Sequence, residues 1–370
     1  MENPFSFSGI VDDPAFCNRE KEQAELTRLI KTSQNVLLYS HRRFGKTSLI
    51  LKVFKQIRGV TPVYIDLYGT TGIPDFIRAA LTGISAAEPK IKRLMQLVRE
   101  TITGFSVNFS LDPVTGLPAA VPQLAPDRKT IPVEQVFRLA EAVSAKKKMA
   151  IAFDEFQEVA RYGGEPFEKQ LRACIQQHEN IAYVFAGSQK HLITDMFNNA
   201  KRAFFRQAAS FPLEKIAPEA YVEWIANLYR RDNRTIDNAL IVQVVRRCDG
   251  HPACIQEFFH HLWDEKTVSV ALIDQLERRI IRRRMAEFAY AWDSLTLNQR
   301  RALKLIVFTG GKSLYAVDHL AAFGFRTPSQ ATAAVDKLIE REFVVKNGVY
   351  QLQDPIFKRW LELSQNIGQP

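Results

Sequence analysis

The chain has 370 residues, of which 46% are hydrophobic and 24% charged, and its formal net charge at pH 7 is +10. This length predicts two or three domains, each with its own core. No apolar run approaches the roughly 20 residues that a membrane helix needs, and residues 1–4 lack the basic-then-apolar pattern of a signal peptide. We therefore expect a cytoplasmic protein with no membrane partner. The positive charge favours a polyanionic partner without identifying one.

Short apolar runs alternate with helix-like segments through the first half of the chain. Residues 36–39 predict a strand that is followed by a polar, basic loop and a helix from Lys46 to Ile57. Further strands are predicted at residues 63–65, 149–153, 182–186 and 208–213. This alternation indicates an α/β fold in which helices cover both faces of a parallel sheet. Residues 103–132, which alternate and then carry five prolines, predict an insertion made of a hairpin or strand and an irregular loop.

The second half of the chain has a different pattern. Helices are predicted at residues 218–229, 236–247 and 252–263, and then at 297–308, 314–323 and 330–342. Asn347-Gly348 between β-forming residues is a strong hairpin signal. We therefore predict a domain of residues 1–213, an all-helical lid subdomain at 214–273 and a winged helix-turn-helix domain at 274–370.

The four cysteines are Cys17, Cys174, Cys248 and Cys254. None of their spacings matches a Cys-x-x-Cys pair, although Cys248 and Cys254 are close in sequence. We expect reduced thiols with a structural role.

The loop after the first strand carries a phosphate-binding pattern. Its residues are Ser40, His41, Arg42, Arg43, Phe44, Gly45, Lys46 and Thr47. They fit G-x-x-x-x-G-K-[ST], except that Ser40 replaces the first glycine. Gly45 lets the backbone wrap the phosphates, Lys46 reaches the β- and γ-phosphates, and the Thr47 hydroxyl binds magnesium. The strand–loop–helix context disfavours a chance match and predicts ATP and Mg2+ as ligands.

Polar residues follow two of the other predicted strands. Asp154 is expected to hold Mg2+ through water, and Glu155 to polarise the attacking water. Without the loop upstream, such an acidic pair is usually a solvated helix start. Ser188 and Gln189 should lie beside these carboxylates and sense the γ-phosphate, although Ser188 can equally cap the next helix.

These residues together resemble the AAA+ superfamily, and more closely its archaeal-type ATPase group, which is related to the STAND ATPases. The resemblance covers most of the chain, and the pieces that carry it are Phe16 to Glu20, Arg42 to Leu49 and Asp154 to Gln157. It implies a P-loop ATPase whose nucleotide site includes Ser48, with Asn18 and Arg19 near the adenine.

Two more positions take roles only from this resemblance. Pro252, in Gly250-His251-Pro252, matches a lid motif near the nucleotide; the alternative is a helix end followed by a proline-initiated helix. Arg206 matches an arginine that contacts the γ-phosphate within the chain or across the interface of a homo-oligomer. It can equally be a surface or ion-pairing arginine. Ser40 departs from the family pattern, which leaves the hydrolysis rate open. The 103–132 insertion is a second departure, and the sequence assigns it no role.

Two basic features lie in the last third of the chain. The first is a stripe of Arg278, Arg279, Arg282, Arg283 and Arg284 on one predicted helix. It can follow DNA phosphates, or be a solvated face or a contact for acidic residues of the ATPase domain. The second is the candidate recognition helix from Gln330 to Glu342, with Thr332 and Lys337 on it and Lys346 in the wing. It has few base-reading side chains and also carries Asp336 and Glu340, so protein contacts are as well supported as DNA contacts.

Three functions compete at this point. The first is an ATP-hydrolysing switch or motor that couples its nucleotide state to DNA or a protein partner. The second is a DNA-binding regulator whose ATP site turns over slowly or not at all. A metabolic kinase is disfavoured, because kinases with this loop rarely carry a lid and a winged helix.

Overall fold

The computed structural model describes residues 2–103, 106–111, 118–123 and 131–365. Backbone contacts divide the chain into two units. The sheet unit runs from Arg19 to Glu214, and the helical unit combines the residues up to Asn18 with those from Lys215 onward. The finer boundaries at residues 213 and 273 stay a prediction.

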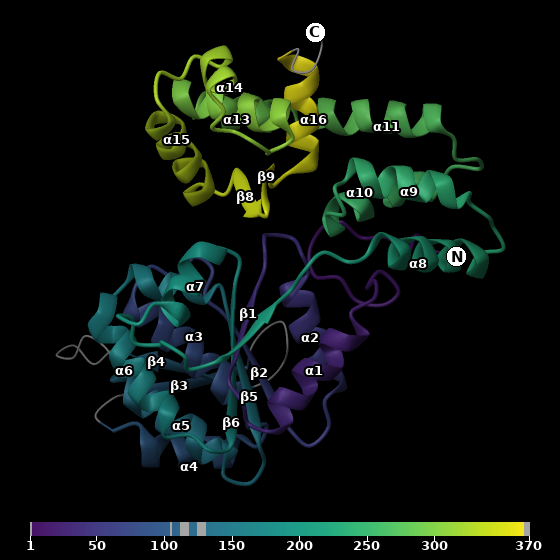
Figure 1. Cartoon of the computed structure of the whole chain (residues 1–370). Coiled ribbons are helices and arrows are strands. Elements are labelled where there is room, and N and C mark those ends of the chain that lie inside the picture. The colour runs from purple at the N-terminus through teal and green to yellow at the C-terminus, as the bar shows by residue number, and fades with distance from the viewer. Residues whose placement is uncertain (1, 104–105, 112–117, 124–130, 366–370) are drawn as a thin grey trace. The chain divides into compact units, whose positions relative to one another are not determined.

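The sheet unit holds a five-stranded parallel sheet with the order β2-β5-β6-β1-β7 (Figure 1). Its strands are β1 (Val36–Tyr39), β2 (Thr61–Asp66), β5 (Met149–Asp154), β6 (Ile181–Gly187) and β7 (Ala209–Pro212). Its helices are α1 (Glu20–Lys31), α2 (Lys46–Gln56), α3 (Ile73–Ala86), α4 (Ile91–Thr101), α5 (Val133–Ser144), the 3-10 helix η1 (Phe156–Arg161), α6 (Gly164–Gln176) and α7 (Lys190–Asn198). Every strand predicted for this sheet is present, so the α/β prediction is confirmed.

Large and small side chains alternate along the central strands, so one face of the sheet is lined by large side chains and the other by small ones. Different helices pack on each face. In β5, Ile151 and Phe153 point to one face, where Phe76 of α3 and Phe137 of α5 stack on Phe153. Successive strand residues face opposite ways, so Ala150 and the other small residues form the second face. Helices α1 and α2 contact β6 and lie on that side of the sheet (Figure 1). Small residues there let these two helices pack close to the sheet.

The insertion contains an antiparallel strand pair, as expected. Strand β3 (Ser106–Leu111) pairs with β4 (Pro118–Gln123), with Ser106 opposite Gln123. The predicted irregular loop falls partly on residues 124–130, which lie outside the described residues.

The helical unit contains the predicted helices and the wing. Its elements are α8 (Pro218–Arg231), α9 (Asn238–Arg247), α10 (Pro252–Leu262), α11 (Val270–Arg283), α12 (Met285–Asp293), α13 (Leu297–Thr309), α14 (Val317–Ala322), α15 (Pro328–Glu340), β8 (Val344–Asn347), β9 (Val349–Leu352) and α16 (Pro355–Ser364). The candidate recognition helix α15 starts two residues earlier than predicted, because Thr327 accepts a hydrogen bond from the Gln330 N–H and caps it. It also ends two residues earlier, before Glu342, whose φ of 60° is left-handed.

The N-terminal residues complete the core of the helical unit. The Phe5 ring lies 5.4 Å from Trp224 and 5.5 Å from Phe259. Gln256 of α10 donates a hydrogen bond of 2.6 Å to the Ala15 carbonyl. The chain therefore begins in the helical unit and enters the sheet unit at Arg19.

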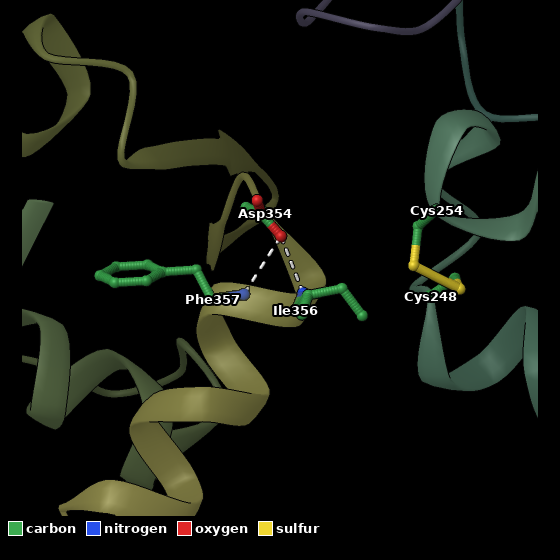
Figure 2. The surroundings of a disulfide bond; sticks show 5 residues. All are labelled: Cys248, Cys254, Asp354, Ile356 and Phe357. Atoms are coloured by element: carbon green, nitrogen blue, oxygen red, sulfur yellow. Dashed lines mark hydrogen bonds between the residues drawn. A yellow bond between two sulfur atoms is a disulfide. The ribbon is translucent and has the colours of Figure 1, made fainter. Parts of the chain in front are cut away.

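A disulfide joins Cys248 to Cys254, so the expectation of four reduced thiols is wrong for this pair. Cys248 ends α9 and Cys254 lies in the first turn of α10, and the tight turn between these helices brings their Cα atoms to 5.6 Å. Figure 2 shows the bond beside the start of α16, where Asp354 accepts hydrogen bonds from the N–H groups of Ile356 and Phe357. Cys17 and Cys174 are buried thiols, and burial raises the pKa of Cys174 to about 11.

Among the helices described, none combines the length and the apolar character that crossing a membrane requires.

The partly buried imidazole of His178 predicts a pH dependence of stability. Burial lowers its pKa against a smaller opposing effect of Glu141, and its Nδ1 is hydrogen-bonded to the Tyr183 hydroxyl at 2.6 Å. The unfolded chain therefore takes up this proton first, and stability is lost as the pH falls below about 6.5. We expect the thermal midpoint to drop between about pH 7 and pH 5, and to drop less for His178→Gln. Equal slopes for the two proteins would contradict this assignment.

Candidate functional site

The loop from Ser40 to Thr47 joins the end of β1 to the start of α2. Gly45 stands at the N-cap of α2 with φ of 87°, a left-handed torsion that side chains oppose. A Cβ there would meet nothing within 4 Å, so the torsion and not crowding requires glycine. The first N–H groups of α2 have no partner within the helix and open towards this loop. Such a helix start can hold an anion, phosphate in particular.

Lys46 is buried, at 5% exposure, and its ammonium folds back on the loop. Its Nζ donates to the Ser40 carbonyl and hydroxyl, both at 3.4 Å, and to the His41 carbonyl at 3.3 Å. These acceptors are neutral and the bonds are long, so an anionic phosphate would be a stronger partner for the ammonium. Ser40, which stands where the loop pattern has glycine, thus supplies two of the oxygens that Lys46 contacts.

The Thr47 hydroxyl and the Asp154 carboxylate are in direct contact. Thr47 Oγ1 donates to Asp154 Oδ2 at 2.5 Å, and the hydroxyl of Tyr64 donates to the same oxygen at 2.8 Å. The Glu155 N–H donates to Asp154 Oδ1 at 3.0 Å. Burial, followed by the charge of Asp154, raises the pKa of Tyr64, which keeps it a donor. Hydroxyl and carboxylate oxygens are ligands that Mg2+ prefers.

Asp66, at the end of β2, adds a further carboxylate to this edge of the sheet. It lies opposite Asp154 in the β2–β5 register, and partial burial raises its pKa, with Asp154 and Glu155 adding to the rise. Within the part of the chain that the structure describes, no group of three or more acidic, histidine or cysteine side chains is arranged to hold a metal. A metal at Thr47 and Asp154 would therefore need ligands from water or from a bound phosphate.

The Glu155 carboxylate is held by two neutral donors. Its Oε2 accepts from the Ser188 hydroxyl at 2.9 Å and from the side-chain amide of Gln157. The predicted meeting of Glu155 and Ser188 is thus present, and the hydroxyl of Ser188 points to the carboxylate instead of capping α7. Gln189 lies apart from this pair, because its Oε1 accepts from Arg161 at 3.1 Å.

Gln157 holds Glu155 at an energetic cost. It is 1% exposed, and its carbonyl oxygen has no hydrogen-bond partner among the described residues. A buried carbonyl without a partner costs about 1–3 kcal/mol. Only the NH2 end can face a carboxylate, so the contact with Glu155 fixes the orientation of the amide. Sequence reasoning assigned Gln157 no role of its own within the Asp154 to Gln157 motif, and it gave no sign of Tyr64, because only the folded sheet brings Tyr64 to Asp154.

The other predicted nucleotide-site residues lie in varied surroundings. Arg42 and Arg43 are exposed, Phe44 and Ser48 are buried, and the His41 ring meets Phe44 edge-on at 5.7 Å. Arg19 is buried and donates to Glu22 and to the Glu214 carbonyl, both at 2.6 Å. Arg206 is exposed, with its guanidinium 5.0 Å from the Phe205 ring. Asn18 and Pro252 belong to the helical unit, and their predicted proximity to the nucleotide stays a prediction.

Among the basic features, the stripe is smaller than predicted. Arg284 is the C-cap residue of α11, and its guanidinium forms ion pairs with Glu287 at 3.0 Å and with Asp354 at 2.5 Å. It therefore does not belong to the exposed stripe, which consists of Arg278, Arg279, Arg282 and Arg283. The sequence could not show this, because Asp354 lies 70 residues away along the chain.

Gly187 at the end of β6 packs closely against the side chain of Gln157, which holds Glu155. A Cβ on Gly187 would clash with Gln157 Oε1 and lie 2.5 Å from Ile193 Cδ1. We expect Gly187→Ala to lower the free energy of unfolding by about 1–3 kcal/mol, measured by urea titration. Gly72→Ala is the matched control, since a Cβ there meets only Pro74 at 3.6 Å. An equally stable Gly187→Ala variant would show that Gln157 is free to move.

With this geometry in place, known proteins show where the fold recurs. Residues 286–363 match the family model of a probable winged helix domain. The Walker-type ATPase PABY2304 of Pyrococcus abyssi superposes with a TM-score of 0.65 at 18% identity, over 97% of this chain and 99% of that one. The ORC2 protein of Aeropyrum pernix, in ADPNP–ADP complexes, gives 0.56 at 14% identity, over 98% and 96%. No curated protein sequence matches the chain. The chain therefore has the fold of the AAA+ P-loop ATPases, followed by a winged helix domain.

Proposed function

We propose that this chain binds ATP with Mg2+ at the loop from Ser40 to Thr47, hydrolyses it, and couples the nucleotide state to a macromolecular partner through its C-terminal half. One observation carries the proposal. The end of β5 presents Asp154 to the Thr47 hydroxyl and Glu155 to the Ser188 hydroxyl. A metal-binding pair and a candidate base thus stand at one sheet edge, next to a loop that can hold phosphate.

The residues divide the work of phosphoryl transfer. The N–H groups at the start of α2 and the Lys46 ammonium bind the phosphates, and Thr47 and Asp154 hold the metal. Bound Mg2+ would neutralise charge that develops on the phosphate oxygens. Tyr64 keeps Asp154 oriented through its hydrogen bond of 2.8 Å.

Glu155 is the proposed water-activating group. Gln157 and Ser188 both bond to Oε2, which fixes the plane of the carboxylate and leaves Oε1 to accept a proton from water. Ser188, which bonds to Glu155, is the proposed γ-phosphate sensor, and Gln189 beside it in the chain is the second candidate for this role. The partner is DNA or a protein. The winged helix domain supports either. The likeness to ORC2, which was solved with bound nucleotide, supports the nucleotide site.

Two substitutions separate binding from turnover. We expect Glu155→Gln to keep ATP affinity and to lower turnover by about 10²- to 10⁴-fold, because it removes the base alone. Lys46→Ala should weaken binding by roughly tenfold or more, since a charge-assisted bond to phosphate is lost. Affinity is measured by calorimetry and turnover by phosphate release. The surface variants Glu165→Gln and Lys169→Ala are matched controls, because these residues pair only with each other in the described structure.

Equal turnover of Glu155→Gln and wild type would remove Glu155 from the reaction. Tight ATP binding by the wild type with no turnover at any partner concentration would instead favour a non-hydrolysing, ATP-dependent regulator.

Arg206 tests whether assembly contributes to hydrolysis. Its guanidinium is exposed and lies over its own neighbour Phe205, so it is accessible to a nucleotide bound by a second copy. We expect turnover per molecule to rise with protein concentration in the wild type and in Lys201→Ala, and to stay low and flat in Arg206→Ala. Turnover that is independent of concentration in all three proteins would place Arg206 outside the reaction or within a single chain.

A further inference from the structure

The outward face of α11 concentrates positive charge. Arg278 and Arg282 are four residues apart, as are Arg279 and Arg283, and all four side chains are exposed. Ile273, Leu276 and Ile280 fill the opposite, buried face. Residues four apart on a helix are neighbours, so these arginines repel one another.

The acidic residues of α11 do not neutralise this face. Asp274 pairs with Arg247 at 2.5 Å, and Glu277 bonds to Arg359 at 3.3 Å and to Arg247 at 3.5 Å. In the part of the chain that the structure describes, no carboxylate forms an ion pair with Arg278, Arg279 or Arg282. The helix therefore keeps its own acids for packing against α9 and α16 and leaves the arginines to solvent.

The end of α10 extends this face. Arg283 Nη1 donates to His261 Nε2 at 3.3 Å, and the contact between α10 and α11 keeps the two helices adjacent. The half-exposed Phe7 ring packs on His260 and His261 at 5.0 and 5.9 Å. Arginines interleaved with rings are typical of surfaces that bind nucleic acid.

His261 makes the charge of this face depend on pH. Burial lowers the pKa of His261, and the charges of Arg283, Arg279 and His260 lower it further, while Asp264 opposes them. Glu257 stands one turn before His261 on α10. At neutral pH the imidazole is thus an uncharged acceptor for Arg283. A bound polyanion would offset the arginine charges and favour protonation of the ring.

The candidate recognition helix α15 is, in contrast, poorly suited to an anionic groove. Its lysine, Lys337, is paired with Glu340 at 2.6 Å, and Asp336 is exposed beside them. Gln330 is engaged locally, because its Oε1 accepts from the Arg326 N–H at 3.2 Å. Base reading needs Arg, Lys, Asn or Gln side chains that are available at the helix start.

We propose that the α10–α11 face, formed by Arg278, Arg279, Arg282, Arg283 and His261, binds the phosphate backbone of nucleic acid independently of sequence, in place of α15. This inference rests on the proposed coupling to a macromolecular partner and assigns the chemistry of that partner. Four phosphate contacts give a slope of log affinity against log salt of about −3.6 on duplex DNA and about −2.8 on a single strand.

The test uses the full chain and fluorescent random-sequence DNA, duplex and single-stranded, with anisotropy read across salt concentrations. For Arg278→Gln/Arg282→Gln we expect affinity to fall by about tenfold or more and the slope to flatten by roughly 2. Arg278→Lys/Arg282→Lys should keep the slope, which separates charge from folding. Arg326→Gln/Lys346→Gln removes equal charge from the winged helix and should have little effect.

Acidification supplies a second readout. Wild-type binding should tighten as the pH falls from about 8 to about 5.5, and less so in His261→Gln. The form of nucleic acid that binds more tightly, duplex or single-stranded, is the form this face recognises. If it is the single strand, Phe7→Ala should weaken the binding.

Three results would overturn the proposal: a larger loss in the winged-helix variant, an unchanged slope in Arg278→Gln/Arg282→Gln, or no DNA binding by the wild type at low salt. ATP turnover of the same preparations without DNA tests the proposed ATPase separately, so either idea can fail alone.

Discussion

The hydrogen bond from the Thr47 hydroxyl to the Asp154 carboxylate joins the two halves of the candidate site. Thr47 belongs to α2, which follows β1, and Asp154 ends β5, which is separated from β1 by β6. The contact is made because all these strands run parallel and end at one edge. The large side chains on one sheet face and the small ones on the other fix the packing of α2 and so hold this distance.

The same edge has a second layer of support. Tyr64 orients Asp154 from β2, and Gln157 orients Glu155 from η1, so each carboxylate has a neutral donor behind it. Gln157 keeps this place although its carbonyl end is buried without a partner among the described residues. Buried polar groups that are only half satisfied are expected where chemistry outweighs stability. This buried amide, bonded at its NH2 end and without a partner at its carbonyl end in the described part of the chain, is the strongest structural reason to propose a function for Glu155.

The sequence predicted what depends on local pattern. Apolar runs predicted each strand of the sheet, and the strand–loop–helix pattern around Gly45 and Lys46 predicted the loop that joins β1 to α2. What it missed depends on distant partners: Tyr64 reaches Asp154 only through the β2–β5 register. Likewise, the turn between α9 and α10 pairs Cys248 with Cys254, and Asp354 removes Arg284 from the stripe. The helical spacing of the stripe was predicted correctly, but which arginines stay exposed depends on tertiary contacts.

Titration of the wild-type protein with ATP, with and without Mg2+, tests most directly whether Thr47 and Asp154 bind a metal ion together with the nucleotide. We expect ATP to bind and Mg2+ to tighten the binding, because Thr47 and Asp154 would hold the metal and the metal would neutralise phosphate charge. Identical affinity with and without Mg2+, or no binding of ATP at all, would contradict it.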